Sequence, residues 1–153
     1  GKTLPAGTGL GLAFYFCHAA HVAEVAEVSV DADRNYRVEK VTVAVDVGPI
    51  VNRSGAMSQV QGSVIDGLST MAGQQITMEN GVIQQDNFDQ YPVMRIAATP
   101  EVDVHFIESD NPSTGLGEPA LPPLAPAVTN AIHAATGVRI RSMPLSELGF
   151  KLV

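Results

Sequence analysis

The sequence contains little cysteine, little positive charge and no long apolar run. One cysteine among 153 residues, Cys17, excludes an internal disulfide framework. Nine Lys and Arg against sixteen Asp and Glu give a net charge of −7, and the basic residues form no cluster, so no nucleic-acid partner is expected. No apolar run approaches the roughly 20 residues that cross a bilayer, and no signal-peptide pattern opens the chain. We therefore expect a soluble protein. If the protein is bacterial, it could be cytoplasmic or periplasmic, and the composition does not distinguish the two.

Hydrophobic periodicity predicts both strands and helices in a chain long enough for about one domain. Strands are expected at 12–16, 22–30, 36–47 and 102–107, and short hairpin strands at 75–78 and 82–85 on either side of Asn80-Gly81. The strand at 22–30 has apolar residues on both faces, so it should lie inside the sheet, and 31–35 should turn the chain into the next strand. Apolar residues at three- and four-residue steps predict helices at about 54–72 and 122–136. Residues 88–95 show no regular period.

Two segments with several glycines lie outside the predicted strands. Gly7 to Gly11 superficially resembles a dinucleotide-binding loop, but the preceding strand and the following helix are missing, so we interpret it as a turn leading into a strand. Gly62 and Gly67 lie in the first predicted helix, where a missing side chain would permit close packing.

Cys17, His18 and His21 place soft and imidazole ligands close together, between the first two predicted strands. The cluster lacks the second half of any zinc-ligand spacing, so a metal is not expected there. A place at the edge of the sheet or in the lining of a cofactor site remains open.

The most distinctive stretch is residues 113–123, which read Ser-Thr-Gly-Leu-Gly-Glu-Pro-Ala-Leu-Pro-Pro. Gly115 and Gly117 permit positive φ and close approach to another molecule, and the two final prolines suit the first turn of a helix. Glu118 would then lie near free N–H groups, where an anion can also bind. Taken alone, the pattern favours the simpler interpretation that Glu118 is a capping carboxylate and the glycines form a tight turn.

Residues 115–132 and 134–141 together resemble the C-terminal signature of the molybdenum hydroxylases, the xanthine dehydrogenase and aldehyde oxidoreductase family, and most of all the isoquinoline 1-oxidoreductase large (beta) subunit. The strand, aspartate, glycine and asparagine at 43–52 and the Asn-Phe and Tyr-Pro segment near 88–92 match as well. The resemblance extends from about Leu4 to Leu145. It implies an α+β molybdenum-cofactor-binding domain: a two-layer mixed sheet packed by two main helices, occupying 1–153 as one C-terminal domain of a longer large subunit.

The resemblance also implies roles for individual residues. Glu118 would be the general base that deprotonates a molybdenum-bound hydroxyl as it attacks an aldehyde or an electron-poor N-heteroaromatic carbon, with oxygen derived from water. Gln59 would contact the cofactor, together with Gly115, Leu116 and Gly117, although Gln59 could simply be a solvated helix residue. Gln61 replaces the family's usual glutamate, which removes any role for charge at that position. Desolvation would raise the basicity of Glu118 and neighbouring N–H donors would lower it, and the sequence does not decide between them.

The resemblance implies a molybdopterin cofactor, in a cytosine dinucleotide form, shared with the rest of the large subunit, and iron–sulfur clusters on a partner. This chain alone is expected to be inactive, whether it is an excised domain, a separate gene product or a remnant, and an exposed apolar face could favour self-association. Two other functions stay open: a non-catalytic structural or assembly domain that binds partner chains, and an unrelated small-molecule-binding module.

Overall fold

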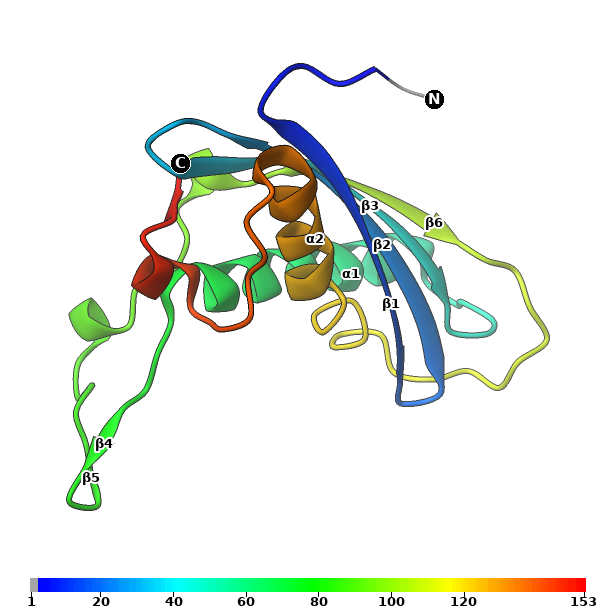
Figure 1. Cartoon of the computed structure of the whole chain (residues 1–153). Helices are drawn as coiled ribbons and strands as arrows, with labels where there is room; N and C mark the ends of the chain where they lie inside the picture. Colours follow the sequence, from blue (N-terminus) through cyan, green and yellow to red (C-terminus); the bar gives the residue numbers. More distant parts are fainter. Residues whose placement is uncertain (1–2) are drawn as a thin grey trace.

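A mixed β-sheet with two helices packed on one face forms the body of the computed structural model, which describes residues 3–153 (Figure 1). Strands β1 (Thr8–Cys17), β2 (Ala20–Val30) and β3 (Asn35–Asp46) follow one another as an antiparallel meander. Strand β6 (Glu101–Phe106) then pairs in parallel with β3, giving the order β1-β2-β3-β6, and the short β7 (Lys151–Leu152) pairs with the start of β3. The predicted α+β architecture is confirmed.

The core lies between the inner face of this sheet and helices α1 (Arg53–Gly73) and α2 (Leu124–Thr136). Alternate residues of β2 and β3 point inward, so the valines at 22, 28, 41, 43 and 45 are buried almost completely. Apolar residues of both helices close over them, namely Val60, Val64, Leu68, Leu124, Val128 and Ile132. The expectation that 22–30 is an internal strand is confirmed, because β2 pairs with β1 on one side and β3 on the other.

Capping and turn residues fix most element boundaries where the sequence places them. Asn52 caps α1 by accepting from the backbone N–H of Gly55 at 2.9 Å. Asp31 Oδ1 accepts from the N–H groups of Asp33 and Asn35 and so closes the turn before β3. Helix α2 begins at Leu124, slightly later than predicted, and ends where Gly137 adopts φ +78°.

The Asn80-Gly81 hairpin forms as predicted, with both residues at positive φ. Its strands β4 (Met78–Glu79) and β5 (Val82–Ile83) are shorter than expected and form a separate two-stranded sheet that projects from the body (Figure 1). The irregular connection beyond it contains two 3-10 turns, η1 (Phe88–Gln90) and η2 (Ile96–Ala98), and a third, η3 (Leu145–Leu148), precedes β7.

The start of the chain differs from the prediction. Strand β1 begins at Thr8 rather than Leu12, so Gly9 and Gly11 lie within a strand and not in a turn. It ends at Cys17, and β2 begins at Ala20 after only two intervening residues. Those residues, His18 and Ala19, have φ values of 51° and 65°, which is the left-handed geometry of a tight hairpin turn.

Candidate functional site

The glycine-rich loop leaves strand β6 and crosses one end of the sheet before it enters α2; it is the yellow connection in Figure 1. Thr114 donates its backbone N–H to the carbonyl of Val47 at 3.1 Å, and the Ser113 hydroxyl donates to the carbonyl of Pro49 at 3.0 Å. The buried hydroxyl of Ser63 on α1 donates to the carbonyl of Gly117. The loop is therefore fixed both to the end of β3 and to α1.

Asp46, the last residue of β3, organises the first part of this loop. One of its carboxylate oxygens accepts from the Ser109 hydroxyl at 2.6 Å and from the N–H of Gly48 at 3.1 Å, and the other accepts from the Asn111 amide at 2.8 Å. These bonds, the one from Ser109 foremost, hold the pKa of Asp46 below its usual range. Gly48 has φ +71°, and a Cβ there would meet the carbonyl oxygen of Asn111 at 2.3 Å, so the turn needs glycine.

Glu118 projects from the surface at this end of the sheet. Its side chain is 79% exposed, and its Oε2 lies 3.3 Å from Nε2 of His18 at the tip of the β1–β2 hairpin. The Glu118 backbone carbonyl accepts from the N–H of Leu121 at 2.9 Å, so the residue opens a turn that precedes α2. The expected place beside the first turn of the helix is therefore wrong, since α2 begins only at Leu124. The residues described here do not supply the expected water-poor surroundings.

Gln59 and Gly117 lie against each other although they are far apart in sequence. A Cβ placed on Gly117 would meet the Gln59 side-chain oxygen at 2.7 Å. Gln59 itself is exposed on the first turns of α1. The absence of a side chain at 117 thus lets the Gln59 amide approach the loop backbone, whereas neither Gly115 nor Gly117 adopts the positive φ that was expected.

The other two predicted loop residues differ in environment. A Cβ on Gly115 would have nothing within 4 Å, so this position faces open space. Leu116 is half-buried and packs against the core, which holds the loop down. Within residues 3–153, the backbone N–H groups of Gly115 and Leu116 have no acceptor. Those donors are available to a ligand.

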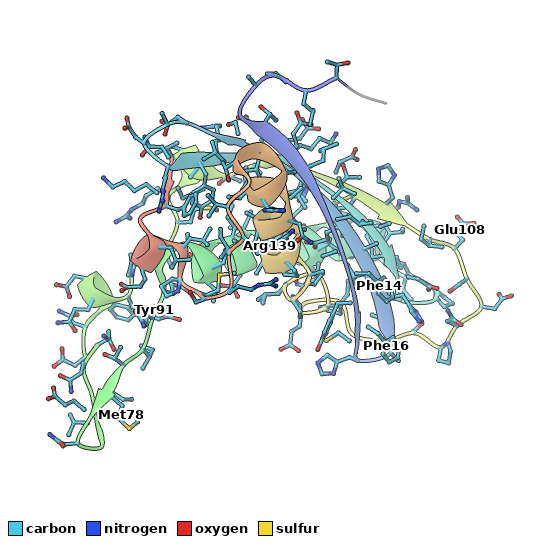
Figure 2. All side chains as sticks on the ribbon, in the orientation of Figure 1. Phe14, Phe16, Met78, Tyr91, Glu108 and Arg139 are labelled. Atoms are coloured by element: carbon cyan, nitrogen blue, oxygen red, sulfur yellow. The ribbon has the colours of Figure 1, made fainter. Side chains whose placement is uncertain are left out.

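The β1–β2 hairpin places the cysteine and histidine side chains of the cluster in different surroundings. Cys17 is half-buried at the end of β1, and the His21 ring lies tilted against that of Phe16 across the strand pair, with 4.9 Å between the ring centroids. Figure 2 labels Phe14 and Phe16 along the same strand. No group of three or more His, Cys, Asp or Glu able to hold a metal ion occurs in the part of the chain described by the structure.

Sequence reasoning missed the contacts of Ser63 and Thr114 that shape this site, and for His18 it left open a place at the sheet edge or in the lining of a cofactor site. Thr114 donates its hydroxyl to the backbone carbonyl of His18, so the hairpin tip and the glycine-rich loop are joined at two points. No local pattern reveals these contacts, because each joins segments that are distant in sequence. The first two predicted strands left five residues between them, at 17–21, so nothing in the sequence indicated the two-residue turn that the structure shows.

Comparison with known proteins identifies the family. Residues 3–100 match the model of the molybdopterin cofactor-binding domain. The chain is 36% identical over 140 residues to the isoquinoline 1-oxidoreductase subunit beta of Brevundimonas diminuta, covering 91% of this chain and 18% of that protein. It is 38% identical over 151 residues to a membrane-bound aldehyde dehydrogenase of Gluconacetobacter polyoxogenes, whose name includes pyrroloquinoline quinone, covering 95% of this chain and 20% of that one.

The same fold occurs in a solved enzyme structure. Quinoline 2-oxidoreductase of Pseudomonas putida 86 superposes with a TM-score of 0.74 over 82% of this chain and 17% of that chain, at 20% sequence identity. The chain thus spans about a fifth of the length of the relatives it matches. No helix among residues 3–153 has the length and apolarity needed to cross a membrane. The chain belongs to the molybdopterin cofactor-binding domain family and corresponds to part of the molybdenum-binding subunit of a molybdenum hydroxylase.

Proposed function

We propose that this chain supplies the general base and part of the cofactor-binding surface of a molybdenum hydroxylase that oxidises an aldehyde or an N-heteroaromatic compound. The observation that carries the proposal is the meeting of the Glu118 loop with Gln59 of α1 across the bare backbone of Gly117. A carboxylate, a side-chain amide and unused backbone donors are thereby gathered at one end of the sheet.

The residues present suit a molybdopterin cofactor. Its phosphates and ring heteroatoms need hydrogen-bond donors and a backbone that can be approached closely, and the N–H groups of Gly115 and Leu116 provide such donors next to an open glycine. The Gln59 amide offers both a donor and an acceptor at the same place. Gln59, Gly115, Leu116 and Gly117 are therefore the residues that would hold the cofactor.

Glu118 has the freedom and the chemistry of a proton acceptor. When bound, the cofactor supplies the two-electron acceptor and the oxygen taken from water. In this proposal the Glu118 carboxylate would accept the proton released from the water-derived oxygen, and one of its carboxyl oxygens would hold that proton afterwards. The anchored loop keeps the backbone of Glu118 in position, because Ser63, Leu116 and Thr114 tie the residues that directly precede it.

The rest of the large subunit would cover this exposed end of the sheet. Its closure would remove water from Glu118, which this chain alone leaves 79% exposed. We further propose that the cofactor is the cytosine dinucleotide form and that electrons leave through iron–sulfur clusters on a small subunit or domain. On this view residues 1–153 are the C-terminal domain of that large subunit and are inactive on their own.

Cofactor analysis of the complete enzyme, purified with its natural neighbours, tests the binding role. We expect one molybdenum per large subunit and cytidine nucleotide after acid hydrolysis. Pyrroloquinoline quinone should be absent, and it needs its own assay because the name of one relative includes it. An enzyme that carries neither molybdenum nor quinone would instead support the alternative, a structural or assembly domain in which Glu118 merely closes a turn.

Substitution tests the catalytic role. Glu118→Gln keeps the size of the side chain and removes its basicity, so the complete enzyme should retain molybdenum and lose at least about 100-fold in kcat. Glu108→Gln is the matched control, because Glu108 is an exposed glutamate on the same connection, labelled in Figure 2. Near-normal turnover by the Glu118 variant would remove this residue from the mechanism.

A further inference from the structure

The tip of the β1–β2 hairpin touches the glycine-rich loop beside Glu118. His18 and Ala19 form the turn, and both have left-handed backbone geometry. His18 Nε2 lies 3.3 Å from Glu118 Oε2, while the Thr114 hydroxyl donates to the His18 carbonyl. Side chain and backbone of one residue thus contact the same loop at two separate points.

This arrangement fixes where the imidazole can lie. A two-residue hairpin turn leaves its backbone little freedom, and the bond from Thr114 sets its distance from the loop. Histidine tolerates the left-handed region better than most residues with a side chain, so the turn can carry an imidazole there. The His18 side chain is 64% exposed, which leaves room for it to meet a ligand or a covering segment.

The other ionisable groups of the hairpin are engaged elsewhere. The His21 ring contacts that of Phe16 in a tilted arrangement and lies near the Asp46 carboxylate, and Cys17 is half-buried at the end of its strand. Asp46 is itself held by Ser109, Gly48 and Asn111. Glu118 is therefore the carboxylate that His18 meets.

We propose that His18 is a positioning residue for the general base: its imidazole holds Oε2 of Glu118 and leaves Oε1 directed to take the proton. The inference rests on the proposed function, since it assigns a helper to the same carboxylate. Without the imidazole, a glutamate that projects into solvent samples several rotamers, and only some of them place an oxygen at the attacking group.

Two substitutions in the complete enzyme separate the side-chain contact from the turn. His18→Asn keeps a residue that accepts left-handed geometry but shortens the side chain so that it cannot reach Glu118. His18→Gln restores a nitrogen donor at nearly the same distance from the backbone. We expect His18→Asn to lower kcat about tenfold with KM and molybdenum content unchanged, and His18→Gln to stay within about threefold of the wild type.

His21→Asn is the matched control, because it removes an imidazole from the same hairpin that contacts Phe16 instead of the loop. It should leave kcat unchanged. A His18→Asn enzyme with wild-type kcat would overturn the proposal. So would a His18→Gln enzyme as slow as His18→Asn, since the loss would then come from the turn and not from the contact.

Combination with Glu118→Gln distinguishes this inference from the function on which it rests. If His18 acts through Glu118, adding His18→Asn to Glu118→Gln should cause no further loss of kcat. A further tenfold loss in the double variant would overturn the positioning role while the base remains. Full turnover by Glu118→Gln alone would overturn the proposed function and this inference together.

Discussion

The four-residue sequence Thr-Gly-Leu-Gly occurs twice in this chain, and the two copies have different structural roles. At 8–11 it forms the start of strand β1, and at 114–117 it forms the loop that carries Glu118. In the first copy, a Cβ on Gly9 would meet the carbonyl oxygen of Ala131 at 2.2 Å, and one on Gly11 would meet that of Ala127 at 2.0 Å. In the second copy, Gly115 faces open space and Gly117 meets only the flexible end of Gln59.

The difference shows that a glycine pair gets its role from what packs against it. The first copy lets the backbone of α2 lie directly on β1, and Asn130 of that helix also donates to the carbonyl of Leu12 at 3.1 Å. In the second copy, the backbone N–H groups of Gly115 and Leu116 have no acceptor in the described part of the chain. One pair serves packing, and the other serves access to a ligand.

The largest stability effect should come from the first copy. Gly11→Ala would place a methyl group against two backbone atoms of α2, Ala127 O at 2.0 Å and Ala131 N at 2.3 Å, so the helix must move. We expect a loss of about 3 kcal/mol or more in the free energy of unfolding, measured by urea denaturation. Gly115→Ala is the paired control and should change stability by less than about 0.5 kcal/mol. Equal losses of unfolding free energy in Gly11→Ala and Gly115→Ala would contradict the difference between the two copies.

A second contrast concerns two glutamates. Glu24 of β2 is wholly buried on the inner face, opposite Val43, and its carboxyl oxygens have no hydrogen-bond partner among residues 3–153, whereas Glu118 is mostly exposed. Burial raises the pKa of Glu24 from 4.5 to about 8, because desolvation disfavours the charged form.

The folded protein therefore holds a proton on Glu24 that the unfolded chain releases above pH 4.5. The stabilisation that goes with this proton is complete below pH 4.5 and is lost as the pH rises towards 8, at about 1.4 kcal/mol per pH unit. Glu24→Gln should flatten this dependence when unfolding is measured from pH 5 to 9, and Glu118→Gln should leave it in place. An unchanged slope in Glu24→Gln would show that another group titrates.

The smallest effect concerns the bond that fixes the second copy to α1. Ser63→Ala removes the buried hydroxyl that donates to the carbonyl of Gly117 and should cost about 1 kcal/mol of unfolding free energy. Ser58→Ala, on the exposed side of the same helix, should cost almost nothing, since its hydroxyl bonds only to the carbonyl of Ser54. Identical values for the two serines would mean that the loop is not held through Ser63.

The sequence was sufficient for features with a local cause. The strand at β3, the helix at α1 and the Asn80-Gly81 turn follow from residue chemistry within a few positions, and the structure confirms them. Local patterns were misleading where the packing of a residue depends on segments that are distant in sequence. Gly62 was expected to permit close packing, but a Cβ there would meet nothing within 4 Å, whereas a Cβ on Gly67 would lie 3.2 Å from the Leu121 carbonyl oxygen.

The same limit applies to the candidate site. Glu118, Gln59 and the loop residues came from the family resemblance, and their meeting across Gly117 became visible only in three dimensions. The part played by Asp46 in holding the loop was hidden, because its partners Ser109 and Asn111 lie far along the chain. The cluster that contains His18 was expected at the sheet edge or in the lining of a cofactor site, but the contact of His18 with Glu118 depends on a hairpin turn that the sequence did not predict.

The central claim is that Glu118 takes the proton in the chemical step, and single-turnover kinetics tests it most directly. The complete enzyme and its Glu118→Gln variant, matched for molybdenum content, would be mixed anaerobically with substrate, and the rate of cofactor reduction followed by absorbance. We predict a rate constant at least about 100-fold lower for the variant. A rate constant within a few-fold of the wild type, at equal molybdenum content, would contradict the account.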